Sequence, residues 1–178
     1  FVNLLSVACA QESEPELEFV LQLNVTLGES YGVGQTPHGI RHIIPITGGT
    51  FEGPNIKGEI LAGGADYQLI NTQLNRTELE AIYCIRTHDG VNIHVRNTGI
   101  IAPQTSGAYF YTSPKFEAPV GSAYEWLNNG IYVCRPSGGM QNGICLKVWK
   151  IRDAYDFRNI VAPIPGIPDA IRQPAQKQ

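Results

Sequence analysis

Residues 16–27 alternate between apolar and polar side chains with a period of two. The apolar positions are Leu17, Phe19, Leu21, Leu23, Val25 and Leu27. Successive side chains of a strand point to opposite faces, so this alternation predicts a strand with one buried face. The pattern returns in residues 78–87 and 91–96. Between these two segments lies His88-Asp89-Gly90, and Asp-Gly is typical of a tight hairpin. Antiparallel strands are therefore the basic unit of this chain.

Further strands are predicted over residues 41–51, 56–61, 65–70, 109–116, 131–135 and 144–151, with glycine pairs marking turns or bulges between them. Only residues 122–129, closed by Gly130, could form a helical turn. The sequence thus predicts an all-β fold: a single antiparallel β-barrel of about eight to ten strands. About eight strands can close around one small ligand. A two-sheet sandwich is the alternative.

The 178 residues suit one domain, since a domain typically has about 100–200 residues. We expect an N-terminal segment over residues 1–15, the barrel over 16–152, and a Pro-rich extended tail over 153–178. The tail contains Pro163, Pro165, Pro168 and Pro174.

Charge and motifs exclude several function classes. The net charge is −3 with scattered Lys and Arg, so no basic surface is expected to follow nucleic acid. No stretch reaches the ~18 apolar residues of a membrane span. The four His have no metal-ligand spacing, no Gly-x-Ser-x-Gly elbow occurs, and no glycine-rich nucleotide loop is present. We therefore expect no metal and no cofactor. Glu52, Asp66 and Glu117 leave a glycosidase-type carboxylate pair open.

Three features predict secretion. Residues 1–10 are apolar and end in Ala8-Cys9-Ala10, which is typical of a signal-peptide cleavage site; the alternative is a strand of the mature chain. Asn24 and Asn75 lie in sequons and are predicted to carry glycans. The four Cys lack zinc-site spacing.

The cysteines also predict disulfides. Cys134 and Cys145 flank a turn-rich stretch between two predicted strands, so we expect them to face each other across a hairpin and form a bond. Cys9 and Cys84 are the remaining, weaker pairing.

Several motifs resemble one family of small bacterial and fungal proteins. They lie at residues 36–39, 44–54, 63–67, 95–99, 109–117 and 124–128. These segments resemble the domain of unknown function 3237 family, and the resemblance covers about residues 17–151. It implies a compact antiparallel β-barrel, and for most members it implies no assigned activity.

The secretion signals, the cysteines and the Pro-rich tail depart from the bacterial pattern. They resemble secreted fungal proteins of secondary-metabolite clusters, and in general character the hetero-Diels–Alderases that join tropolones to humulene-type sesquiterpenes. This second resemblance implies cofactor-independent pericyclic chemistry.

Aromatic and polar strand residues are the candidate site. A buried Tyr needs a partner for its hydroxyl and often lines a ligand site. The candidate catalytic residues are Asp66, Arg96 and Tyr109, and the candidate substrate-binding residues are Arg41, Phe51, Tyr67, Tyr83, His94, Tyr111, Phe116 and Trp126. Asp66 and Tyr67 are adjacent, so they point to opposite sides of a strand unless it bends.

The predicted function is a hetero-Diels–Alder type coupling or cyclisation of hydrophobic polyketide or terpenoid intermediates, in which the barrel acts mainly by positioning. The alternatives are a lipocalin-like carrier of a small hydrophobic molecule and a secreted structural protein with a filled core. The expected partner is a hydrophobic small molecule, without nucleic acid or a membrane span, and a homodimer is left open.

Overall fold

The computed structural model describes residues 14–140 and 142–152. Within them the chain forms ten strands and one short 3-10 helix. They are β1 (Glu16–Leu27), β2 (Tyr31–Thr36), β3 (Gly39–Glu52), β4 (Lys57–Ile60), β5 (Gly64–Asn71), β6 (Arg76–Thr87), β7 (Asn92–Pro103), β8 (Ala108–Glu117), η1 (Glu125–Asn128), β9 (Tyr132–Met140) and β10 (Gly143–Arg152). The predicted all-β class is confirmed.

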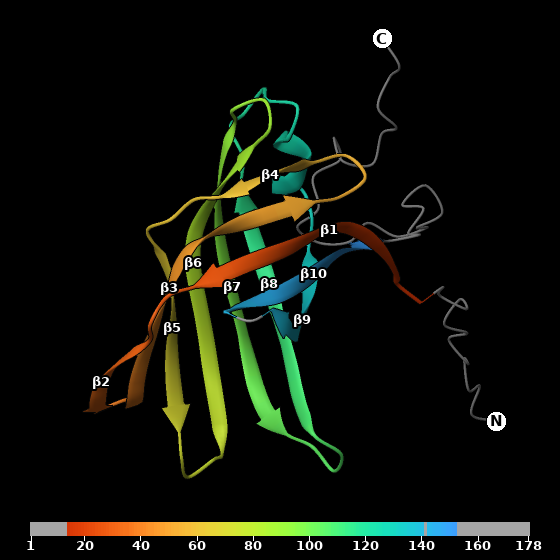
Figure 1. Ribbon diagram of the computed structural model, residues 1–178. Helices are drawn as coiled ribbons and strands as arrows, with labels where there is room; N and C mark the ends of the chain where they lie inside the picture. The colour runs from red at the N-terminus through yellow and green to blue at the C-terminus, as the bar shows by residue number, and fades with distance from the viewer. Residues whose placement is uncertain (1–13, 141, 153–178) are drawn as a thin grey trace, which may run out of the picture. The chain divides into compact units, whose positions relative to one another are not determined.

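The strands close into an antiparallel barrel (Figure 1). The order runs β1-β10-β9-β8-β7-β6, continues through β4 and β5 to β3, and returns to β1 because Gln22–Leu27 pair with Ile46–Glu52. β4 and β5 occupy successive stretches of the same position between β3 and β6, so eight strand positions surround the interior. β2 adds to the other edge of β3. Closure pairs the strand edges that an open sheet would expose.

Glycine permits the closure at β3. Gly49 has a φ of 135°, and a Cβ on this residue would lie 2.1 Å from the carbonyl oxygen of Asn24 on β1. Any side chain here would therefore force β1 and β3 apart.

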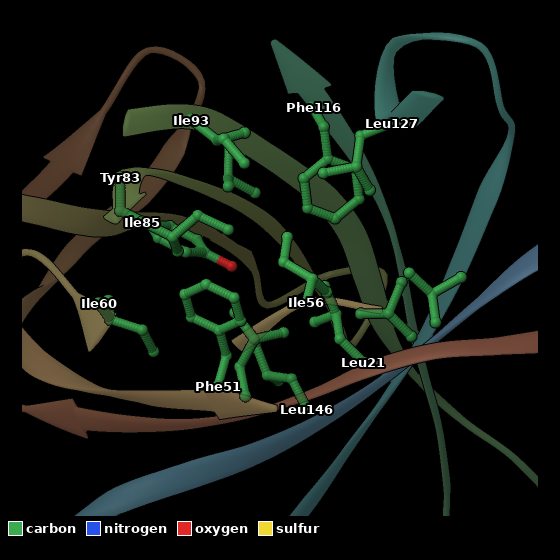
Figure 2. Close-up of a cluster of buried hydrophobic side chains, with 14 of the residues drawn as sticks. Leu21, Phe51, Ile56, Ile60, Tyr83, Ile85, Ile93, Phe116, Leu127 and Leu146 are labelled. Carbon is green, nitrogen blue, oxygen red and sulfur yellow. The ribbon is translucent and has the colours of Figure 1, made fainter. Parts of the chain in front are cut away.

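One half of the barrel is filled with large side chains. Figure 2 shows them converging from opposite walls: Leu21, Phe51, Ile56, Ile60, Ile85, Ile93, Phe116 and Leu127 are all buried. The rings of Phe116 and Tyr132 meet edge to face with centroids 5.0 Å apart. We call this the filled half.

The η1 segment covers the end of the filled half. Leu127 is fully buried, and the Tyr132 hydroxyl donates to its carbonyl oxygen at 3.0 Å. The Tyr124 hydroxyl donates to Asp89 Oδ1 at 2.9 Å, which ties this segment to the β6–β7 turn. The turns between β5 and β6 and between β7 and β8 lie at the opposite end of the barrel (Figure 1).

The predicted strands are found, most with small shifts, but β7 and β9 run seven and five residues past their predicted ends. The structure also adds β2, which sequence periodicity did not predict. The predicted Cys134–Cys145 disulfide is wrong, because both thiols are free. In the hairpin register Cys134 pairs with Val148 and Cys145 with Ser137, with a bulge between residues 143 and 145. Cys134 is buried beside Val148, whereas Cys145 has the opposite strand parity. The two thiols therefore face opposite sides of the sheet.

Other expectations concern the ends of the chain. Residues 1–10, including Cys9, and the tail over 153–178 lie outside the described residues. Cys84 is half-buried and has no disulfide partner within the described residues. Among the residues that the structure describes, no helix has the length and apolar character needed to cross a bilayer.

Candidate active site

The other half of the barrel encloses a cavity of about 180 Å³. Its walls are mostly apolar and come from strands all round the barrel. The lining residues are Val25, Leu27, Ile44, Ile46, Asp66, Gln68, Leu79, Ala81, Tyr83, Asn97, Ile101, Phe110, Thr112, Pro136, Ile144 and Leu146. We call this part the hollow half.

Strand alternation aims these side chains inward. On β7, Ile93 and Val95 are buried in the core, and Asn97 follows on the same face as the first cavity residue. Gly99 comes next, and a Cβ there would lie 2.4 Å from both Thr112 Cγ2 and the Tyr111 carbonyl oxygen. The missing side chain lets β7 and β8 approach closely where Thr112 enters the cavity.

Asp66 is the ionisable carboxyl of this wall. Its Oδ2 accepts a hydrogen bond from Gln68 Nε2 at 2.9 Å, and its Oδ1 accepts one from the Glu80 backbone N–H at 3.2 Å. Burial raises the pKa of Asp66 above its ordinary value of 3.8, although these hydrogen bonds and nearby His42 act to lower it. A carboxyl that holds its proton more tightly beside an apolar cavity is a candidate general acid.

The strand ladder opens beside this carboxyl. β5 and β6 pair at Asp66 with Ala81 and again at Leu69 with Glu78, and the two residues between are unpaired. In this gap the Asp66 side chain accepts a hydrogen bond from the Glu80 backbone N–H. A backbone donor thus holds the carboxyl at the cavity wall.

A second set of polar residues lies on the side of the cavity formed by β7, β8 and β9. Asn97 and Thr112 line the space, and both stand beside the thiol of Cys134, whose register partner is Thr112. Burial raises the pKa of Cys134 to about 11. Because thiolate is the reactive form, this thiol is a poor nucleophile at neutral pH.

Tyr83 stands where the filled and hollow halves meet. It belongs to the buried core and also lines the cavity. Burial raises the pKa of its hydroxyl, and nearby Cys134 adds to the shift. The hydroxyl therefore stays neutral and can only donate or accept hydrogen bonds.

The structure brings only two of the predicted site residues into the cavity. Asp66 and Tyr83 line it. Phe51 and Phe116 are buried in the filled half, and Trp126 packs against that core. The other six occupy alternate strand positions whose side chains point to the outer face of the barrel: Arg41, Tyr67, His94, Arg96, Tyr109 and Tyr111. Asp66 and Tyr67 indeed point to opposite sides of β5, and Tyr67 is exposed.

The outer-face residues mostly bind one another. Arg96 donates to Glu80, and the rings of Tyr109 and Tyr111 pack with centroids 5.0 Å apart. A hollow of about 480 Å³ lies among these side chains, but it is open and polar. Its arginines are engaged, because Arg76 pairs with Glu78 and Arg41 donates to the Tyr67 carbonyl oxygen. We therefore place the candidate site inside the barrel.

Sequence reasoning missed Gln68, Asn97, Thr112 and Cys134. The signal for Asn97 was present, since extending the alternation of Ile93 and Val95 puts residue 97 on the inner face. The sequence signal for Thr112 on β8 was weaker, because the aromatic residues Tyr109, Phe110 and Tyr111 lie on both faces of that strand. Within the described residues, no three His, Cys, Asp or Glu side chains gather as a metal site.

Comparison with known proteins finds several relatives. Residues 15–151 match the family described as "Protein of unknown function (DUF3237)". A UPF0311 protein of Clostridium acetobutylicum is 35% identical, over 78% of this chain and 95% of the relative. The hydroalkoxylation enzyme phnH of Penicillium herquei is 31% identical, over 72% of this chain and 84% of that enzyme.

Solved structures share the fold. A beta-barrel like protein from Acinetobacter baumannii superposes with a TM-score of 0.72 at 26% identity, over 80% of this chain and 99% of the other. An enzyme from Penicillium herquei gives a TM-score of 0.65 at 28% identity, over 80% and 98%. The chain therefore belongs to the DUF3237 family and shares its barrel fold with these solved structures, and one distant relative is named as a hydroalkoxylation enzyme.

Proposed function

We propose that this protein is a cofactor-independent enzyme that closes a ring by addition to a carbon–carbon double bond of a hydrophobic intermediate. The reaction takes place in the hollow half. The observation that carries the proposal is one carboxyl, Asp66, with a raised pKa in a mostly apolar cavity. The name of the Penicillium herquei relative supports the reaction class.

The cavity size limits what enters it. A dry apolar cavity of about 150 Å³ holds a benzene-sized ring, so about 180 Å³ accepts one six-membered ring. An open groove of about 450 Å³ shares Leu27 and Ile44 with the cavity and is also lined by Glu29 and Ser30. The reacting ring would lie inside the barrel, with the rest of the molecule along this groove.

Two additions fit this site, and they use Asp66 differently. In hydroalkoxylation, the carboxyl proton moves to one alkene carbon, the substrate hydroxyl oxygen bonds to the other, and the hydroxyl proton returns to the carboxylate. In a hetero-Diels–Alder coupling no proton is transferred, and Asp66 only donates a hydrogen bond that polarises the heteroatom. Orientation in the cavity alone can supply on the order of 7–11 kcal/mol of the barrier.

A lipocalin-like carrier is the second candidate. Small-molecule sites of either kind usually measure about 300–1,000 Å³, so this cavity of about 180 Å³ would hold only part of a ligand in both cases. Turnover therefore distinguishes the enzyme from the carrier.

Secretion remains a proposal, supported by the sequons. Asn75 is exposed in the β5–β6 turn, while Asn24 is half-buried and accepts a hydrogen bond from Gln22 at 3.2 Å. Glycosidase treatment of the protein from its native source should lower its mass. An unchanged mass would contradict both glycans.

Turnover with two probes tests the function. An ortho-allyl phenol carries the hydroxyl and alkene of a hydroalkoxylation, and an ortho-quinone methide with an electron-rich alkene reports cycloaddition. We expect the purified chain to accelerate one of them and to give an enantiomeric excess. Asp66→Asn should lower hydroalkoxylation by about 10²–10⁴-fold but cycloaddition much less. Glu117→Gln, an exposed outer-face carboxyl, is the matched control. Racemic product at the buffer rate with both probes would contradict the proposal.

A further inference from the structure

Two polar atoms in the wall of the hollow half have only a weak neighbour. Asn97 Oδ1 and Thr112 Oγ1 are buried beside the Cys134 thiol and make no hydrogen bond to oxygen or nitrogen within the described residues. The two residues are only 4% and 8% exposed, and both line the cavity. Buried polar atoms are normally paired, so each such exception needs an explanation.

The polar group on β5 is different. Both oxygens of Asp66 are occupied, by Gln68 and by the Glu80 N–H. Each Asp66 oxygen thus already accepts a hydrogen bond, whereas the buried oxygens without a strong donor lie on the side of Asn97 and Thr112.

We propose that Asn97 and Thr112 bind a hydroxyl group carried on a six-membered ring of the substrate, an inference that rests on the proposed function. An amide oxygen can only accept, so the ligand must donate to Asn97. A threonine hydroxyl can donate, so the same ligand atom can accept from Thr112. A hydroxyl oxygen does both. A ketone could not donate to Asn97, and a methyl group would leave both protein oxygens unpaired.

The register places Asn97 of this hydroxyl-binding pair two strands along the barrel wall from Asp66. Asp66 pairs with Ala81 and Ala81 pairs with Asn97, so the three residues lie side by side on adjacent strands. Two strand spacings separate Asp66 from Asn97 by about 9–10 Å along the sheet. Ala81 between them leaves room, so a ring lying over it would reach Asn97 with one edge and Asp66 with the other.

Thr112 is held where this binding requires it. Its register partner on β7 is Gly99, whose missing side chain admits the Thr112 methyl group. Its partner on β9 is Cys134, which is fully buried. The threonine is thus enclosed from both neighbouring strands, and its hydroxyl lies beside the Cys134 thiol in the cavity wall.

The test compares two ligands of the same shape. p-Cresol and p-xylene differ by a hydroxyl in place of a methyl group. NMR titration of the full-length protein measures both affinities, and the amide shifts of residues 97 and 112 report the place of binding. We expect p-cresol to bind about tenfold more tightly, because a site built to hydrogen-bond a hydroxyl rejects the analogue that lacks it.

Variants assign the preference to the two side chains. Thr112→Val and Asn97→Leu keep the shape of each residue and should bring the affinity ratio close to one. Thr98→Val is the matched control, because Thr98 is exposed on the outer face of β7, and it should keep the full preference. Shifts of residues 97 and 112 on adding p-cresol to the wild type show that the ligand reaches the pair even where a variant fails to fold.

Three results would overturn the inference. They are equal affinity of the wild type for both ligands, a preference that survives in both Thr112→Val and Asn97→Leu, and no p-cresol binding at millimolar concentration. If any of these occurs while the turnover probes still react, the hydroxyl-binding pair is wrong and the proposed enzyme stands. If p-cresol selection holds without turnover, the reaction is wrong and the binding site stands.

Discussion

The filled half and the hollow half use the same strands in opposite ways. In the filled half, β6 and β8 send Ile85 and Phe116 inward, and η1 adds Leu127. In the hollow half, the same two strands send Ala81 and Thr112 inward, and β7 has Gly99. Barrel closure therefore does not decide whether the interior is filled. The volume of the side chains that each strand points inward decides it.

Polar groups follow the same division. At the filled end, Asp89 lies in a turn and accepts hydrogen bonds from the hydroxyls of Thr87 and Tyr124, which hold its pKa below its ordinary value. In the hollow half, burial raises the pKa of Asp66. The first carboxyl ties two loops together, whereas the second is held in a form suited to proton transfer.

A pair of matched truncations should give the largest contrast. Leu127→Ala removes a fully buried side chain from a packed core and should lower the free energy of unfolding by about 2–5 kcal/mol. Leu79→Ala enlarges a space that already exists, so we expect roughly 1–2 kcal/mol, below that range. Urea unfolding measures both values. Equal losses would show that the two halves are packed alike.

Gly99→Ala should disturb the hollow half from within. The new methyl group would lie 2.4 Å from the Tyr111 carbonyl oxygen, so β7 and β8 must separate. Overpacking of this kind lowers stability by about 1–3 kcal/mol and should also weaken p-cresol binding. Gly32→Ala is a control for space, since Gly32 on β2 has no positive φ and a Cβ there meets nothing closer than 3.9 Å. Unchanged ligand affinity in Gly99→Ala would contradict the close approach.

The two carboxyls should give pH dependences of opposite sign. The folded-state pKa of Asp66 is raised. Its favourable contribution to the free energy of unfolding is therefore complete below about pH 3.8 and is lost as the pH rises through the raised pKa. Asp66→Asn should therefore gain stability relative to wild type as pH rises, and His42 is the neighbouring ionisable side chain that acts on the Asp66 pKa. The pKa of Asp89 is lowered, so its contribution is present above about 3.8 and is lost as pH falls through the lowered value.

We accordingly expect Asp89→Asn to be less stable than the wild type at neutral pH, and this difference in stability should shrink in acid. Thermal unfolding of both variants across pH 2–8, beside the wild type, measures the two trends. Parallel trends would contradict the assignment of the two environments.

The smallest expected effect is the difference in stability between removing a buried hydroxyl that lacks a strong partner and removing one that makes a hydrogen bond. Thr112→Val removes a buried oxygen without a strong partner and should raise the free energy of unfolding by up to about 1 kcal/mol. Ser113→Ala removes a hydroxyl that donates to the Tyr132 carbonyl oxygen at 2.8 Å and should lower it by about 0.5–1.5 kcal/mol. Chemical denaturation resolves the signs. A loss in both variants would mean that Thr112 is satisfied in solution.

Sequence periodicity predicted most of the fold and little of the site. Alternation identified β1 and the β6–β7 hairpin because one face of each strand is buried, a property local to the strand. The cavity is a property of several strands at once. Whether Asp66 meets Asn97 depends on the registers of β5, β6 and β7, which no single segment encodes. The disulfide prediction failed because β9 continues to Met140 and β10 begins at Gly143, so the hairpin register places Cys134 opposite Val148 and not opposite Cys145.

Aromatic residues misled the site prediction for a further physical reason. Tyr109 and Tyr111 resemble cavity residues by type, yet they pack together on the outer face of β8. Phe110 and Thr112, on the other parity of the same strand, face the cavity. Residue type indicates that a ligand site is possible, but strand parity decides which residues belong to it.

Filling the cavity tests the central claim most directly. Ala81 lies between Asp66 and Asn97 and touches the cavity, so Ala81→Phe should occupy the space of the substrate ring while leaving both polar groups in place. The measurement is turnover of the reactive probe by the folded variant, beside p-cresol affinity. We expect turnover to fall to the buffer rate, enantiomeric excess to vanish, and p-cresol binding to be lost. A folded Ala81→Phe protein that keeps its turnover would place the reaction outside the hollow half and contradict the account.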